Sequence, residues 1–164
     1  MSSTRTLEVS LPSDREVRMT RVFDAPRYLV FEAMTKPELL KRWFYGPPGW
    51  SLEVCEVASR AGDRYRYVWR GPDGTEMGMG GICREFVPPE KMVATEKFDT
   101  PWYPGEALVT MTLVEEGGKT TFTLTVRYES QEARDTALRT PMTEGVSMGY
   151  DRLAEMLPSM GRGA

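Results

Sequence analysis

The chain has 164 residues, of which 40% are apolar and 27% are charged, as is usual for one globular domain. Its formal net charge of −3, without a long run of one sign, argues against nucleic acid or an anionic membrane surface as the main partner. The chain contains no histidine, which excludes Ser-His-Asp and Cys-His catalysis and histidine-rich metal sites, so we expect neither a metal nor a cofactor.

The first 14 residues are expected to form an N-terminal extension, either as a short strand or as a flexible segment. Met1 to Arg21 contain no apolar stretch of signal-peptide length, and no later stretch is long enough to span a membrane. The two cysteines, Cys55 and Cys83, match no zinc-site spacing and are interpreted as reduced, buried thiols. The sequence therefore predicts a cytoplasmic protein without a membrane partner.

One strand and two short helices are predicted before residue 50. The strand is Glu16–Phe23, and Asp24 followed by Pro26 is typical of the start of a helix. Pro37 suits the first turn of a second helix, which the run Gly46-Pro47-Pro48-Gly49 is expected to end.

Residues 50–128 alternate between apolar and polar side chains, which predicts consecutive antiparallel hairpins. The expected strands are Trp50–Val57, a strand with Tyr65, Tyr67 and Trp69 on one face, Glu76–Val87, Lys91–Phe98, Ala107–Val114 and Thr120–Tyr128. Gly71-Pro72-Asp73-Gly74 is a strong hairpin turn. The glycines of Met77-Gly78-Met79-Gly80-Gly81 lead into a strand rather than a helix, which favours a bend or a close backbone approach over a phosphate-binding loop.

Two helices are predicted at the C-terminal end. Ser130 caps a short helix that runs to Arg139. Met142, Val146, Tyr150, Leu153 and Leu157 then recur at spacings of four, four, three and four, which indicates one face of a long helix. Pro158 is expected to end this helix, and residues 159–164 are expected to form a flexible tail.

This order of elements predicts an α+β protein with a helix-grip fold. A curved antiparallel sheet of about six to seven strands surrounds the long C-terminal helix, and two short helices follow the first strand. Residues 15–158 are expected to form this single domain, because only the last helix is long enough to lie across several strands.

Several ordered pieces of the chain are similar to one known family. They are Phe23-Asp24-Ala25-Pro26, Thr35 to Trp43, Gly71-Pro72-Asp73-Gly74, Arg84 to Lys91 and Asp151 to Leu157. Over about Arg21 to Leu157 the chain resembles the activator-of-heat-shock-protein-90-ATPase homologue family, within the START-like, birch-pollen-allergen-like superfamily (SRPBCC). The resemblance implies the helix-grip fold and raises the regulation of a chaperone ATPase as a function.

The chain departs from this family in two ways. Bacterial members often carry Gly-Met, three residues and then Gly-Trp at the start of the last helix, where this chain has Pro141 to Val146. This difference should reshape one end of the pocket, so a ligand cannot be transferred from a relative. A lone domain also lacks the extra N-terminal domain of the eukaryotic co-chaperone, so a chaperone partner is possible but not favoured.

Aromatic residues, methionines and glycines of the predicted inner surfaces are candidates for lining a pocket. Methionine adapts to varied shapes, and tyrosine and tryptophan combine an apolar body with a polar end. The candidates are Trp43, Phe44, Tyr67, Trp69, Met77, Met79, Glu96, Phe98, Trp102, Met111, Met142, Gly145, Met148 and Gly149. The same residue types also fill ordinary cores, and no catalytic residue is assigned.

Three candidates have alternative interpretations. Glu96 shares a strand face with Ala94 and Phe98. A carboxylate in a strand is usually solvated, whereas an inward one would be paired or would orient a polar group of a ligand. Gly145 and Gly149 would allow the helix either to pack closely on the sheet or to leave room for a ligand.

The function predicted from the sequence is the binding of a small apolar or aromatic molecule in an internal cavity. Two alternatives stay open: a protein-interaction domain that regulates a chaperone ATPase, and a cavity enzyme of the cyclase or hydrolase type that uses a carboxylate or a tyrosine. The absence of histidine weighs against the enzyme. The protein is expected to be a monomer or a homodimer.

Overall fold

The computed structural model of the chain describes residues 6–162 and confirms the α+β helix-grip fold. The strands are β1 (Glu8–Ser10), β2 (Glu16–Phe23), β3 (Ser51–Glu56), β4 (Arg64–Arg70), β5 (Glu76–Val87), β6 (Lys91–Phe98), β7 (Ala107–Glu116) and β8 (Lys119–Arg127). The helices are α1 (Arg27–Thr35), α2 (Pro37–Leu40), α3 (Gln131–Leu138) and α4 (Met142–Arg162).

The strands form one antiparallel sheet in the order β1-β2-β8-β7-β6-β5-β4-β3. Consecutive hairpins build the run from β3 to β8, and β2 joins it by pairing with β8, where Met19 lies opposite Leu124. The sheet has eight strands rather than six or seven, because β1 in the N-terminal extension pairs with β2. This strand has only three residues, all of them exposed, so it has no apolar alternation from which it could be predicted.

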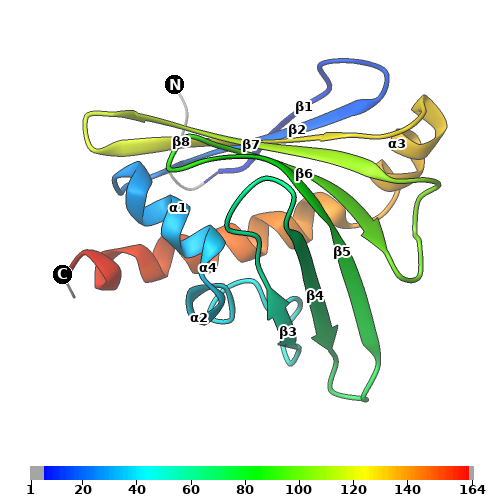
Figure 1. Cartoon of the computed structure of the whole chain (residues 1–164), viewed down its shortest axis with the longest axis horizontal. Coiled ribbons are helices and arrows are strands. Elements are labelled where there is room, and N and C mark those ends of the chain that lie inside the picture. The colour runs from blue at the N-terminus through cyan, green and yellow to red at the C-terminus, as the bar shows by residue number, and fades with distance from the viewer. Residues whose placement is uncertain (1–5, 163–164) are drawn as a thin grey trace.

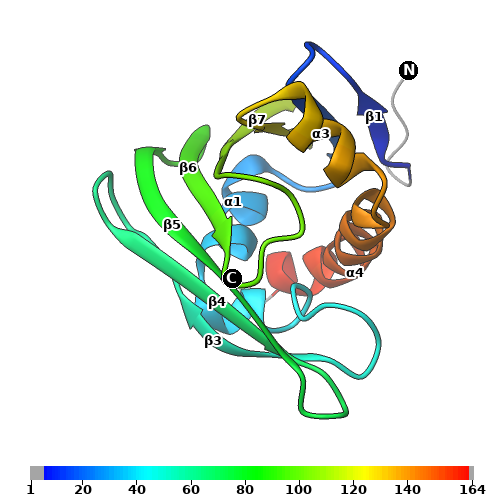
Figure 2. The same cartoon turned by 90° about the vertical axis from the view of Figure 1, so that its right-hand side faces the viewer.

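The sheet curls around the helices, which lie on its concave side (Figures 1 and 2). Helix α4 runs along the sheet, and Tyr150 from this helix packs edge-on against Phe23 of β2 and Phe122 of β8, with ring centroids 5.8 and 5.4 Å apart. Leu153, one turn further, is fully buried. The predicted apolar face of the last helix is therefore the face that forms the core.

Helix α4 continues past Pro158 to Arg162, so the expected end of the helix at Pro158 is wrong. Proline lacks an N–H group and removes one hydrogen bond, but its ring fixes a φ that a helix also uses, and here the chain continues for another turn. Residues 159–162 of the predicted tail are thus helical, and residues 163–164 lie outside the described residues. None of the helices in the range 6–162 combines the length and the apolar character that a membrane span needs.

Helix α1 begins differently from the sequence-based expectation. Its N-cap is Pro26, and the side chain of the expected cap, Asp24, makes no capping hydrogen bond. The backbone N–H of Arg27 instead donates to the carboxylate of Glu115 in β7, at 2.8 Å. A carboxylate distant in the sequence thus satisfies one of the free N–H groups of the first turn.

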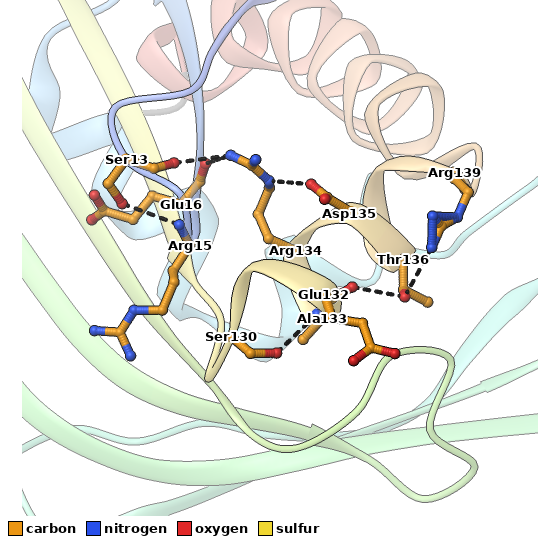
Figure 3. Close-up of polar contacts among 10 residues, drawn as sticks. All are labelled: Ser13, Arg15, Glu16, Ser130, Glu132, Ala133, Arg134, Asp135, Thr136 and Arg139. Atoms are coloured by element: carbon orange, nitrogen blue, oxygen red, sulfur yellow. Dashed lines mark hydrogen bonds and ion pairs between the residues drawn. The ribbon is translucent and has the colours of Figure 1, made fainter.

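Helix α3 is joined to the N-terminal part of the chain by one arginine (Figure 3). The hydroxyl of Ser130 accepts a hydrogen bond from the N–H of Ala133, which confirms Ser130 as the cap. The buried guanidinium of Arg134 donates to the carbonyl of Ser13 at 2.9 Å and to the carboxylate of Asp135 at 2.8 Å. The loop between β1 and β2 is therefore attached to α3.

The glycines of β5 allow a close approach between strands. A Cβ atom on Gly81 would lie 2.0 Å from the carbonyl oxygen of Thr95 in β6, and one on Gly80 would lie 2.7 Å from the carbonyl oxygen of Tyr65 in β4. Both neighbours are backbone atoms, which cannot rotate away. The structure thus confirms that these glycines mark a close backbone approach.

Candidate binding site

An aromatic row covers the concave face of β4. The rings of Tyr65 and Tyr67 lie 5.4 Å apart, and those of Tyr67 and Trp69 lie 5.8 Å apart. Phe44, which follows α2, meets Tyr67 and Trp69 edge-on at 5.3 and 5.2 Å. The indole N–H of Trp69 donates to the carbonyl of Phe44 at 2.9 Å, so the row is fixed to the segment after α2.

A second aromatic group lies at the other end of the concave face. Phe98 from β6 contacts Trp102, Trp102 contacts Tyr103, and Tyr103 contacts Tyr128, the residue after β8, with ring centroids 4.8 to 5.2 Å apart. Trp102 and Tyr103 belong to the loop between β6 and β7. This loop therefore closes over the sheet with its two aromatic side chains.

The buried apolar residues form two core clusters rather than one. The first is centred on α1, α4 and the rings of Phe23 and Phe122, and the second includes Tyr103 and Tyr128. Phe98, Leu124 and Val146 pack against both clusters, yet each remains only partly buried. These three apolar side chains thus lie between the two clusters, and each of them is partly exposed.

Glu96 lies on the concave face of β6, opposite Ala107 of β7. The hydroxyl of Tyr103 donates to its Oε2 atom at 3.0 Å. Burial raises the pKa of Glu96 to about 7, and the hydrogen bond from Tyr103 opposes this shift. The side chain of Glu96 is partly buried, and its carboxyl is shielded from solvent strongly enough to raise its pKa.

Burial raises the pKa of the Tyr67 and Tyr150 hydroxyls, and the structure of residues 6–162 contains no hydrogen bond from a protein group to either hydroxyl or to the Oε1 atom of Glu96. Tyr150 is only 6% exposed. No fully enclosed side-chain nitrogen or oxygen of the described residues lacks a partner. These three atoms must therefore contact space that is large enough for a water molecule.

The structure divides the predicted site residues into three groups. Four are in the core: Trp43, Trp69, Met79 and Gly149. Seven are partly buried: Phe44, Tyr67, Glu96, Phe98, Trp102, Met111 and Met142. Three are exposed: Met77, Gly145 and Met148. Phe98 lies opposite Met79 in the sheet, and Met79 lies opposite Tyr67, which brings these three together on one face.

The expectation that Met77, Gly145 and Met148 line an enclosed cavity is wrong. Met77 is 38% exposed at the start of β5, and Met148 is 40% exposed on the outer side of α4. A Cβ atom added to Gly145 would meet nothing within 4 Å. Gly149 is different, because its Cβ position lies 3.7 Å from the ring of Trp43, so this glycine permits packing rather than a void.

Gly145→Ala is expected to stabilise the protein. Gly145 lies in open space within a helix, and its φ is not in the left-handed region, so alanine should gain about 1 kcal/mol of helix propensity. Urea denaturation monitored by circular dichroism would measure the change in unfolding free energy. A loss of stability on this substitution would mean that the position is enclosed after all.

Sequence reasoning left out several residues of this interior. The spacing predicts the faces of Tyr65, Val146 and Tyr150 correctly, but the candidate set of site residues contains none of these three and does not contain Leu124. Tyr65 donates to the carbonyl of Thr95 at 2.5 Å. The period of two that selected Tyr67 also indicates Tyr65, whereas nothing in the local pattern indicates that the Tyr103 hydroxyl meets Glu96.

The reactive groups of the interior are few. Burial raises the pKa of Tyr65, Tyr103 and Tyr128, and the charge of Glu96 adds to this shift. Both cysteines are free, and burial raises the pKa of Cys55 to about 11, which disfavours a nucleophilic thiolate. No cluster of three or more acidic or cysteine side chains suited to a metal occurs in the described part of the chain.

Two grooves also lie on the surface. One, of about 470 Å³, is bordered by Leu7 and Val9 and by the outer side of α4, including Met148. The other, of about 370 Å³, is bordered by Ser13, Asp14, Arg15 and Arg127. Both grooves are open to solvent, and neither is lined by the aromatic row on β4 or by the second aromatic group. The interior is therefore the better candidate for enclosing an apolar molecule.

Comparisons with known proteins agree with this fold. A protein from Rhodobacter sphaeroides is 29% identical to the chain and superimposes on it with a TM-score of 0.88. The match covers 93% of this chain and 98% of that protein. A protein from Nitrosomonas europaea shares the fold at 24% identity and a TM-score of 0.80, over 93% of this chain and 99% of that protein. A protein from Silicibacter pomeroyi, which is named an AHSA1 protein, shares it at 19% identity and a TM-score of 0.71, over 88% of this chain and 99% of that protein. No curated protein matches the chain.

The sequence over residues 24–158 matches the family model of "Activator of Hsp90 ATPase homolog 1-like protein". This range begins three residues before α1 and runs almost to the end of α4, and it includes the aromatic side chains at both ends of the concave face. The chain therefore belongs to the family of activator of Hsp90 ATPase homolog 1-like proteins.

Proposed function

We propose that this protein binds a small hydrophobic or aromatic molecule in the interior space between the concave face of the sheet and α4. The proposal rests on three buried polar groups, Tyr67, Glu96 and Tyr150, each with an oxygen that no described residue hydrogen-bonds and that is not fully enclosed by protein. A packed core would have sealed or paired them.

The residues around this space suit an apolar ligand. Aromatic rings border it at both ends, and Met111, Leu124 and Val146 lie between them with part of their surface accessible. A ligand that buried about 300 Å² of apolar surface would gain about 7 kcal/mol before ordering costs. Micromolar affinity is thus a reasonable upper limit.

Val146→Phe is expected to weaken ligand binding. Val146 lies on the inner face of α4, so a larger side chain there would occupy the proposed space. Naphthylmethanol, a neutral aromatic probe, should bind the native protein with an affinity no tighter than about micromolar and the variant at least about tenfold more weakly. Titration calorimetry would measure both affinities.

Met148→Phe is the matched control, because Met148 lies on the outer side of the same helix. It should leave the affinity for naphthylmethanol unchanged, and thermal melts would confirm that both variants are folded. Equal affinities of the native protein and Val146→Phe would place the probe elsewhere and would count against the interior site.

The family offers one alternative function, since its name refers to the activation of a chaperone ATPase. Several-fold stimulation of such an ATPase by this protein would favour that role over ligand binding. A cavity enzyme is the other alternative, and Glu96 would be its acid or base. We also propose a cytoplasmic location and a monomeric or homodimeric state.

A further inference from the structure

Glu96 has no basic partner in the interior. The pKa of its carboxyl responds to burial and to Tyr103, and no arginine or lysine of the described residues contributes. The buried arginines have acidic partners of their own: Arg21 pairs with Asp151 at 2.6 Å, and Arg134 pairs with Asp135 at 2.8 Å. A buried acid without a counter-ion is costly when ionised.

Aromatic groups surround this acid. Tyr103 donates to its Oε2 atom, and Tyr65 and Tyr128 lie close enough that its charge raises the pKa of their hydroxyls. Phe98 follows on the same strand face. Ring faces attract cations, and a carboxylate next to them adds a direct ion pair.

We propose that the interior binds a small aromatic molecule that carries one protonated amine, and that the free Oε1 atom of Glu96 anchors this amine. This inference rests on the proposed function, because it requires that the interior binds a ligand. The bond from Tyr103 fixes the Oε2 atom and leaves Oε1 for the ligand. The ligand would supply the positive charge that the protein does not place beside this acid.

Affinity for the amine should rise with pH as this carboxyl ionises. The other titratable groups that face it are the hydroxyls of Tyr65 from β4, Tyr103 from the loop after β6 and Tyr128 from the end of β8, and burial keeps the pKa of each above its ordinary value. Helix α4 reaches this region through Met142, which accepts the hydroxyl of Tyr128 and does not titrate. Glu106 on the same loop is exposed.

Three probes of one shape test this inference: naphthylmethylamine, naphthylmethanol and naphthoate. At about pH 8 the native protein should bind the amine about tenfold more tightly than the alcohol, and naphthoate should bind most weakly. The preference should shrink at about pH 6, where Glu96 is mostly protonated. Near pH 7, binding of the amine should release protons, which calorimetry in two buffers of different ionisation enthalpy would detect.

Glu96→Gln should remove the preference for the amine, so that the amine and the alcohol bind this variant with equal affinity. Glu155→Gln, which removes one charge from the exposed side of α4, should retain the preference. If the alcohol binds the native protein as tightly as the amine does, the interior site stands and the role of Glu96 is overturned. If none of the three probes binds, both the proposed function and this inference are overturned.

Discussion

Trp43→Ala is expected to lower the free energy of unfolding by about 3–5 kcal/mol, the cost of truncating a large buried aromatic side chain. Trp43 is 4% exposed, and its ring packs on Phe44 and Tyr150 with centroids 5.3 and 5.9 Å apart. Its ring also contacts α4 at Gly149, so it joins the segment after α2 to the long helix. Because domains are stable by only about 5–15 kcal/mol, the variant should be close to unfolding at room temperature.

Trp43→Phe separates packing from hydrogen bonding at this position. The indole N–H of Trp43 donates to the carbonyl of Ala33 at 2.9 Å in a buried setting. Phenylalanine keeps most of the ring but leaves this carbonyl without its partner, at a cost of about 1–3 kcal/mol. Tyr28→Ala, at a residue that is 53% exposed, should change stability by less than about 0.5 kcal/mol. Urea denaturation would rank the three variants, and a loss of stability for Trp43→Ala no larger than that for Tyr28→Ala would contradict the packing of Trp43 in the core.

Glu96 is expected to make the native protein less stable as the pH rises from about 5 to about 8. Its pKa is about 7 in the folded protein, above the ordinary 4.5. Below 4.5 both the folded and the unfolded states are protonated, and the full stability is present. As the pH rises the unfolded state ionises first, and stability falls until the folded pKa is passed. The loss is on the order of 3 kcal/mol.

Glu96→Gln should remove this dependence, because glutamine does not titrate. The variant should have a flatter stability profile between about pH 5 and 8 and should be more stable than the native protein at about pH 8. Lowered carboxyl pKa values elsewhere, as at Asp63 and Asp99, affect stability below 3.8 and leave this window alone. Urea denaturation at a series of pH values would measure both profiles, and parallel profiles would mean that the carboxyl is solvated.

Much of the fold could be predicted because local patterns determine it. Phe122, Leu124 and Val126 alternate, and all three lie on the concave face of β8. The turn at Gly71-Pro72-Asp73-Gly74 forms as expected, with a hydrogen bond from Gly74 to Gly71. The continuation of α4 past Pro158 was missed because proline is a strong breaker in general but a tolerable residue when its φ is helical.

The site was less predictable because it depends on contacts between distant segments. The face of Glu96 followed from its strand, but its bond to Tyr103 depends on the path of an irregular loop. Met148 lies outside because the spacing that puts Val146 and Tyr150 on the inner face of α4 puts Met148 on the opposite side of the helix. Its position in the helix, rather than its residue type, determines whether it faces the interior.

The close approach at Gly80 and Gly81 limits how such a protein can diverge. Any side chain at these positions would collide with backbone atoms of β4 or β6. Single substitutions at Gly80 or Gly81 would therefore have to bend the sheet. Positions such as Met111 and Val146 can change size while the backbone stays in place. Natural variants with new ligand preferences should therefore accumulate their changes on β7 and α4, and directed evolution libraries gain most from randomising those elements.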